Sequence, residues 1–305
     1  MKTLLFYLTI IILLFLSCKD EQEQETVKSD IKKPVVYVSN YPLKYFTERI
    51  AASLVDIKFP ARSAGDPAYW QPAPEQIVEM QQADLIILNG ASYEKWLKNV
   101  TLPQSRLVQT SAGFTDKLIP LEETVTHSHG LEGEHEHAGT AFTSWLDMTL
   151  AVEQAKAIKD ALAKLLPQHR SQFEDQFKKL ETDLLALDAE MNQIVSASPN
   201  RKVVFSHPVY QYLERRYGIA GMSVHWEPEE LPDDEMWTDF KHILEHHPAK
   251  WMIWEGEPDK SIVTELDKRG INSVVFDPCG SEPDKGDFLA VMRQNINNIQ
   301  QIYIK

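Results

Sequence analysis

Cysteine is almost absent from this chain, which has only Cys18 and Cys279 among its 305 residues. A disulfide-rich scaffold is therefore excluded, and the fold must rely on a hydrophobic core. Basic residues are outnumbered, with 31 Lys and Arg against 45 Asp and Glu, and the resulting net charge of −14 argues against nucleic acid as a partner and suits a protein that handles cations. After the N-terminal segment, no apolar run reaches the length of about 18 residues that a transmembrane helix needs.

The N-terminus has the pattern of a secretion signal. Lys2 forms a short basic region, and residues 4–16 form an apolar run of about 13 residues, which is too short to span a bilayer. The run ends in Leu16-Ser17-Cys18, which resembles a bacterial lipoprotein cleavage box. We therefore expect residues 1–17 to be a signal peptide and Cys18 to be lipidated. The alternative is an uncleaved anchor helix with an incidental cysteine.

The residues after the signal predict a tether followed by two folded domains. Residues 18–32 are strongly charged and polar, which is typical of a disordered segment. The remaining length of roughly 270 residues is that of two ordinary domains. We predict an N-terminal α/β domain at residues 33–168, a linking helix at 169–198 and a C-terminal α/β domain at 199–305.

Short apolar runs alternate with helical patterns in both halves of the chain, which favours parallel α/β sheets. Residues 84–89 (DLIILN) show the pattern of a strand that is buried on both faces. We therefore predict two Rossmann-like α/β domains. The predicted strands are 33–39, 56–59, 84–89 and 106–109 in the first domain, and 202–206, 222–226, 249–254 and 272–276 in the second. The predicted helices are 41–54, a helix that Pro74 opens, 209–217, 233–246, 260–269 and 288–303.

A long amphipathic helix is predicted between the two halves. In residues 171–197, apolar side chains recur at alternating steps of four and three, which places them in one stripe. Such a helix is roughly 40 Å long, about the diameter of a domain. We expect it to brace both domains, with a ligand cleft between them; the alternatives are an ordinary core helix or a coiled-coil seam. The stripe consists of Phe173, Phe177, Leu180, Leu184, Leu187, Met191 and Ile194.

Four of the ten histidines are concentrated in one short stretch: His127, His129, His135 and His137. Neutral imidazole is the commonest protein ligand for zinc and similar metals, and a short His-rich tract is typical of a metal-binding segment. The alternative is a solvated loop that happens to be rich in histidine. We predict that this tract contacts metal.

Further candidate ligands follow strands of the second half. In open parallel sheets, ligands bind beyond the carboxyl ends of the strands. His207 follows the run VVFS, Glu255 follows WMIW and Asp277 follows SVVF. We predict His207 and Asp277 as metal ligands and Glu255 as a further candidate. The alternatives are a helix cap for His207, a turn at Asp277-Pro278 and a solvated loop for Glu255.

Other residues of these types have simpler interpretations. Histidines near a helix end suit the helix dipole, and a lone cysteine is commonly a small buried residue. Tyr69 and Trp70 are equally suited to lining a cleft and to packing in a core. A structural role is favoured for His225, His242, His246, His247 and Cys279.

Several segments together resemble the periplasmic substrate-binding proteins of zinc and manganese ABC transporters. They are GDPAYWQPAPEQIVEMQQADLIILNG with ASYEKWL, the His-rich segment before TSWLD, SHPVYQYLERRYGI and NSVVFDPCG. No single segment is specific, but together they run through nearly all of the chain after the tether. The resemblance implies two α/β domains joined by one long helix, a metal in the cleft, and a permease with its ATPase as partners.

The resemblance also implies four metal ligands, of which this chain retains two. His207 and Asp277 match the third and fourth ligands, whereas Ala68 and Thr143 stand where the family has histidines. Two ligands rarely hold zinc tightly. Either the tract at 127–137 completes the shell, since a short loop can span the distance at up to about 3.6 Å per residue, or the cleft has acquired another role.

These observations predict a monomeric solute-binding lipoprotein of the cell envelope, periplasmic or on the outer surface, that captures a divalent transition metal for an ABC importer. Zn²⁺ is favoured because imidazole suits it, and Mn²⁺ stays open. No bond is made or broken, so the chain is not predicted to be an enzyme. The alternatives are a metallochaperone or metal buffer without a transporter, and a metal-dependent hydrolase with Glu255 as its base, for which the sequence has no HExxH signature.

Overall fold

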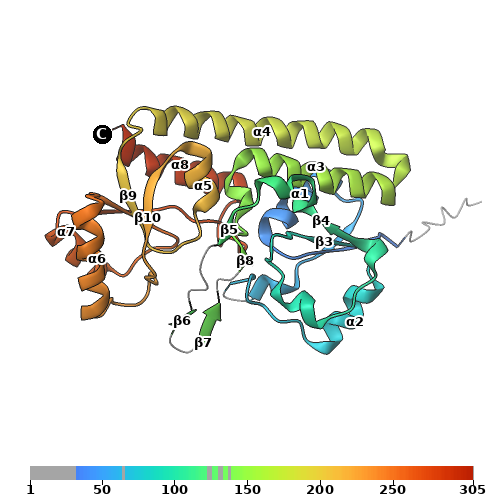
Figure 1. Cartoon of the computed structure of the whole chain (residues 1–305). Helices are drawn as coiled ribbons and strands as arrows, with labels where there is room; N and C mark the ends of the chain where they lie inside the picture. Colours follow the sequence, from blue (N-terminus) through green and yellow to red (C-terminus); the bar gives the residue numbers. More distant parts are fainter. Residues whose placement is uncertain (1–31, 64–65, 122–125, 130–132, 137–138, 305) are drawn as a thin grey trace, which may run out of the picture. The chain divides into compact units, whose positions relative to one another are not determined.

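Each half of the chain contains a four-stranded parallel sheet (Figure 1). The computed structural model describes residues 32–63, 66–121, 126–129, 133–136 and 139–304, so the predicted signal peptide, Cys18 and nearly all of the predicted tether lie outside the described residues. The first sheet has the order β2-β1-β3-β4 and the second the order β10-β9-β11-β12. The strands are β1 (Val35–Val38), β2 (Asp56–Lys58), β3 (Leu85–Leu88), β4 (Leu107–Gln109), β9 (Lys202–Phe205), β10 (Ala220–Ser223), β11 (Trp251–Trp254) and β12 (Asn272–Val275).

The two sheets have the same connectivity, and every strand pair within them is parallel. The predicted α/β class, with two parallel sheets and one long helix, is confirmed. We call residues 33–168 the first lobe and residues 199–305 the second lobe. Residues 33–305 form one compact unit.

One strand is displaced from its prediction. The pattern predicts a strand at 222–226, whereas β10 is Ala220–Ser223. Gly221 pairs with Val203 of β9, and a Cβ at Gly221 would lie 2.3 Å from the Phe205 ring, so close packing of this strand requires glycine. The chain beyond β10 still follows β9, because Trp226 N donates to Ser206 O at 2.7 Å.

Helices connect the strands and begin at side-chain caps in several places. Asn40, Asp147, Asp233 and Asp287 each accept a backbone N–H in the first turn of a helix, which satisfies donors that the helix itself leaves open. The sequence patterns above do not predict α3. The helices are α1 (Tyr41–Ala51), α2 (Pro74–Gln82), α3 (Met148–Leu165), α4 (Arg170–Ser196), α5 (Gln211–Tyr217), α6 (Asp234–His246), α7 (Lys260–Lys268) and α8 (Phe288–Tyr303). Short 3₁₀ turns occupy Pro60–Ser63, Lys95–Asn99, Gln104–Arg106, Thr110–Lys117, Ser144–Leu146 and Pro167–His169.

The long helix α4 packs against helices of both lobes, namely α1 and α3 of the first and α8 of the second (Figure 1). All seven side chains of the predicted apolar stripe are buried. The stripe belongs to one continuous core that includes Val36 and Leu85 of the first sheet and Val203 and Phe205 of the second. The hydrophobic contact between the lobes is therefore organised along α4.

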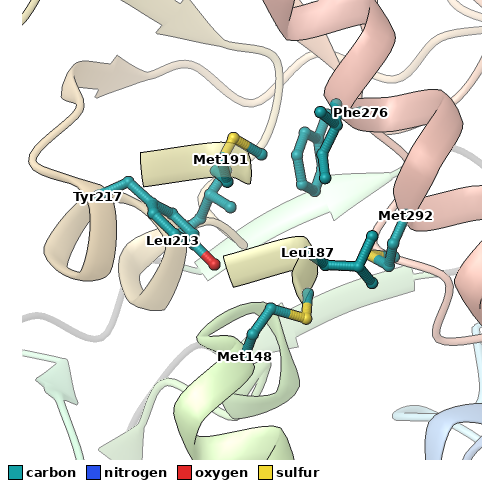
Figure 2. Close-up of a pocket in the computed structure, with 8 residues that line it drawn as sticks. Met148, Leu187, Met191, Leu213, Tyr217, Phe276 and Met292 are labelled. Carbon is teal, nitrogen blue, oxygen red and sulfur yellow. The ribbon is translucent and has the colours of Figure 1, made fainter. Parts of the chain in front are cut away.

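An apolar cavity of about 10 Å³ lies in this core where α3, α4, α5 and α8 approach one another (Figure 2). This volume is close to the lower limit for a single water molecule, and the lining offers no cluster of polar groups. The cavity is therefore a packing defect and not a ligand site. Its lining residues are Met148, Leu187, Met191, Leu213, Tyr217, Phe276, Met292 and Ile296.

Two small antiparallel pairs lie in the connection that carries the histidine tract. β5 (Pro120–Leu121) pairs with β8 (Gly139–Thr140), and β6 (Thr126–His129) pairs with β7 (Gly133–Glu136). In the second pair the backbones of His127 and His135 are cross-strand partners. His137 lies outside the described residues. Within the described part of the chain, no helix combines the length and apolar character that a membrane span requires.

Candidate metal centre

The second sheet brings three candidate ligands together at its topological switch point. From the central strand β9 the chain continues to β10 on one side, and β11 lies on the other side, so a crevice opens beyond the carboxyl ends of β9 and β11. His207 follows β9 and Glu255 follows β11. Glu227 arrives from the extended segment after β10, which remains hydrogen-bonded alongside β9.

The donor atoms of these three side chains lie close to one another. His207 Nδ1 is 3.4 Å from Glu227 Oε1 and 3.5 Å from Glu255 Oε1. All three donors lie within 4.8 Å of one another, and among the described residues no other group of three or more His, Cys, Asp or Glu is this compact. His207 is only 8% exposed, and both glutamates are partly buried. The His225 ring packs edge-on against His207, with centroids 5.5 Å apart.

The electrostatic environment of this group is strongly negative. The pKa of Glu255 is raised to about 8, mainly by burial and then by the neighbouring carboxylates of Glu227, Asp66, Glu229 and Asp277, in that order. Each of these charges opposes ionisation of the buried glutamate. A cation at this position relieves the repulsion.

Asp277 lies near this group but is not one of the three. Its Oδ1 accepts a 2.6 Å hydrogen bond from the backbone N–H of Cys279, and Cys279 has a φ of 58°. The Asn295 side chain holds the Asp277 backbone on both sides, accepting from Asp277 N at 3.0 Å and donating to Asp277 O at 2.7 Å. Burial raises the pKa of Asp277, and the Cys279 amide opposes that rise. The turn considered from the sequence is therefore present, and the ligand role of Asp277 stays a prediction.

The two positions where the resemblance implies histidine are buried in the first lobe. Ala68 is 1% exposed and belongs to the continuous core. Thr143 is 4% exposed, and its hydroxyl donates to Val209 O of the second lobe at 2.5 Å. At these positions the chain therefore has core packing and a hydrogen bond between the lobes.

Three amide side chains are hydrogen-bonded at the switch point of the first sheet, beside the buried carboxyl group of Glu94, which accepts from Asn89 N. Asn40 follows β1 and Asn89 follows β3, and Asn40 Nδ2 donates to Asn89 Oδ1 at 3.3 Å. Gln154 of α3 donates to the same oxygen at 3.0 Å. All three amide side chains are fully buried. The equivalent places of the two sheets thus carry different chemistry, amides in the first and an imidazole with carboxylates in the second.

The loop after β2 faces the second-lobe group. Asp66 Oδ1 accepts from Ala68 N at 2.8 Å, and the charge of Asp66 acts on Glu255. The pKa of Tyr69 is raised, first by burial and then by Asp66, Glu255 and Glu227. The Lys95 ammonium lies over the Tyr69 ring, 4.3 Å from the ring centroid. Tyr69 therefore lies at the boundary between the lobes, whereas Trp70 packs on Trp96 in a satellite core.

Of the residues for which a structural role is predicted, His247 and Cys279 are buried, and His242 and His246 lie at the surface. His247 is buried and its Nε2 lies 2.9 Å from Val203 O, while His242 is exposed beside Glu245 and His246 is exposed. Cys279 is a free, buried thiol whose pKa is raised by burial. For the tract, the structure describes only the backbones of His127, His129 and His135, so their predicted contact with metal is not tested.

Sequence reasoning did not identify Glu227. The same rule that selected His207 and Glu255 points to it, because Glu227 directly follows the predicted strand 222–226. The signal was therefore available, although it is weak where a strand is followed by several acidic residues.

A family model described as ZnuA, the periplasmic component A of a zinc-uptake complex, matches residues 36–302. The chain belongs to this family. The match runs through both lobes and α4, so it includes every residue of the candidate centre.

Relatives of this ZnuA-family chain are named as zinc-uptake or metal-binding transport proteins. The high-affinity zinc uptake system protein ZnuA of Bacillus subtilis is 25% identical, over 97% of this chain and 96% of that protein. The metal ABC transporter substrate-binding lipoprotein SsaB of Streptococcus sanguinis is 22% identical, over 91% of this chain and 92% of that protein. Among solved structures, the metal-dependent lipoprotein YcdH of Bacillus subtilis aligns with a TM-score of 0.76 at 21% identity, covering 89% of this chain and 100% of that one, which shows the shared fold.

Proposed function

We propose that this ZnuA-family protein captures a divalent transition metal in the cell envelope and delivers it to an ABC importer, with Zn²⁺ as the favoured cargo. The observation that carries the proposal is the His207 imidazole, held 3.4 and 3.5 Å from two carboxylate oxygens at a switch point. The names of relatives in zinc uptake support the choice of metal. The ion is bound and released without a chemical reaction, so the protein acts as a solute-binding component and not as an enzyme.

The proposed ligands include those that the sequence predicts. His207 is the central donor, Asp277 and Glu255 are carboxylate candidates, and the histidine tract gathers metal or completes the shell. The tract lies between β5 and β8 in the chain, close in sequence to Thr143. Imidazole ligands must be neutral to bind metal, so proton competition weakens binding as the pH falls through about 6–7.

The proposed partners are a permease with its ATPase and the membrane to which a lipid on Cys18 anchors the protein. The relative SsaB is named as a substrate-binding lipoprotein of a metal ABC transporter. This name supports both the transporter partners and the lipid anchor. The proposal further holds that the protein acts as a monomer and binds no nucleic acid, in keeping with its net charge of −14.

Calorimetry tests metal capture directly. The full chain, purified in detergent, is titrated with Zn²⁺ at neutral pH, together with a variant that lacks residues 127–137 and the variants His207→Ala and His242→Ala. We expect binding in the wild-type chain, loss of one site in His207→Ala, and no change in His242→Ala, whose side chain is exposed. Absence of binding in the wild-type chain contradicts the function. Unchanged stoichiometry in the deletion removes the tract from metal binding.

A further inference from the structure

We infer that the metal is bound on the second lobe, through His207, Glu227 and Glu255. This inference rests on the proposed function and assigns its ligand shell. The resemblance implies ligands from both lobes. The three ligands inferred here all lie at the carboxyl end of the second sheet.

The spacing of the donor atoms fits direct coordination. Zinc binds nitrogen and carboxylate oxygen at about 2.0–2.2 Å, so two donors of a tetrahedral site lie about 3.4 Å apart. The distances from His207 Nδ1 to the two glutamate oxygens are 3.4 and 3.5 Å. The two glutamate oxygens lie within 4.8 Å of each other, so all three donors can face a single ion.

The negative charges around His207, Glu227 and Glu255 favour the binding of a cation. Glu255 is mostly buried and experiences the carboxylates of Glu227, Asp66, Glu229 and Asp277. Buried carboxylates that repel one another are costly unless a positive charge is present. A divalent ion bound to Glu227 and Glu255 neutralises the two nearest charges. Asp66 and Asp277 then act at longer range and favour entry of the cation.

Among the described side chains of the first lobe, those at the implied ligand positions and at the switch point do not supply a metal ligand. Thr143 is committed to the Val209 carbonyl, and Ala68 has no donor. The amides of Asn40 and Asn89 bind each other at the first switch point. Asp66 is a first-lobe carboxylate whose charge acts on Glu255, and its Oδ1 accepts from Ala68 N. Among the described residues, the second lobe therefore supplies the donors, through His207, Glu227 and Glu255.

This donor set has a consequence for selectivity. One imidazole and two carboxylates form a harder site than one dominated by imidazoles, and carboxylates suit Mn²⁺ as well as Zn²⁺. Three protein donors also leave a position for water in a tetrahedral shell. We expect this site to prefer Zn²⁺ over Mn²⁺ less strongly than a site with several histidines does.

The test uses the full chain without residues 127–137, so that the tract does not contribute. Zn²⁺ affinity is measured by competition with a chelator for Glu227→Gln, Glu255→Gln, Asp277→Asn and the control Glu257→Gln. The control removes the same charge from an exposed position two residues beyond Glu255. Loss of a true ligand is expected to weaken binding by at least about tenfold, since even outer-shell changes cost 10–100-fold. We expect that loss for Glu227→Gln and Glu255→Gln, a change within about twofold for Glu257→Gln, and a smaller loss for Asp277→Asn than for either glutamate variant.

A second measurement does not depend on any substitution at the site. X-ray absorption at the zinc edge counts the imidazoles bound to the ion, and one imidazole with oxygen ligands is expected. Two or more imidazoles in the deletion background, or glutamate variants that bind like Glu257→Gln while Asp277→Asn loses binding, overturn the assignment but leave metal capture intact. A wild-type chain that binds no Zn²⁺ instead contradicts the proposed function itself.

Discussion

At position 143, a threonine hydroxyl joins the two lobes. Thr143 is buried, and its O–H donates to Val209 O in the segment just after His207. This contact fixes the first lobe to the loop that carries the main candidate ligand. The imidazole that the resemblance implies at this position has no hydroxyl, so the threonine provides a direct link between the lobes where a metal ligand was expected.

Replacing Thr143 with valine tests this role. Thr143→Val keeps the shape but removes the donor, leaving the Val209 carbonyl without this bond. We expect a loss of roughly 1–3 kcal/mol in the free energy of unfolding, measured by urea denaturation with a chelator present. Thr143→Ser retains the hydroxyl and is the matched control. Equal stability of the wild type and the valine variant rules out an energetic role for this bond.

The buried environment of Glu214 is expected to make the stability of the protein depend on pH. Burial alone raises its pKa from the ordinary value near 4.5 to about 7. Between these values the folded state binds more protons than the unfolded state. The contribution of Glu214 to stability is therefore present below about pH 4.5 and is lost as the pH rises through about 7.

Glu214→Gln removes this titration. Relative to the variant, the wild type is expected to lose stability between pH 5 and pH 8, measured by urea unfolding with a chelator. Glu190→Gln removes the same charge from an exposed position of α4 and serves as the control. A difference between wild type and Glu214→Gln that does not change with pH contradicts the assigned environment.

At the scale of elements, α4 is the part of the fold that the sequence describes best. Its predicted span of 171–197 differs by one residue at each end from the observed Arg170–Ser196. The reason is physical: apolar residues in a 3.6-residue period have one stable outcome when a core lies on one side only. The predicted strand 222–226 is less accurate, because the edge strand β10 is set by its pairing with β9.

Two adjacent leucines of α4 make the stripe testable. Leu184 is fully buried, whereas Leu185 is 43% exposed. We expect Leu184→Ala to lower the free energy of unfolding by about 2–5 kcal/mol and Leu185→Ala to change it by less than about 0.5 kcal/mol. Both are measured by chemical denaturation. Similar losses for the two variants contradict the observed orientation of the helix.

At the scale of the whole described unit, residues 33–305 share one principal core. The apolar cluster includes strands of both sheets and the length of α4, with smaller clusters beneath α2 and beneath α6 and α7. Polar contacts add to this connection, since Trp145 Nε1 of the first lobe donates to Pro278 O of the second at 2.7 Å. The lobes therefore depend on each other for burial.

This shared core predicts cooperative unfolding. The apo protein is expected to show one transition that coincides by tryptophan fluorescence and by far-UV circular dichroism. Saturating Zn²⁺ moves the whole transition upward, by about 2.7 kcal/mol at 100 times the dissociation constant. Two separated transitions, or a metal effect on only one of them, show that the lobes unfold independently.

The sequence by itself determined the parallel α/β class, the long helix and two members of the candidate centre, His207 and Glu255. These follow from periodicity and from the position of polar residues after buried strands, which are local properties of the chain. Only the tertiary structure decided which side chains meet. Glu227 lies beside His207 because the segment after β10 runs along β9, and Asp277 Oδ1 accepts a hydrogen bond from Cys279 N. Distances of a few ångströms between residues far apart in the chain depend on how strands pair and lobes pack, and no local pattern encodes them.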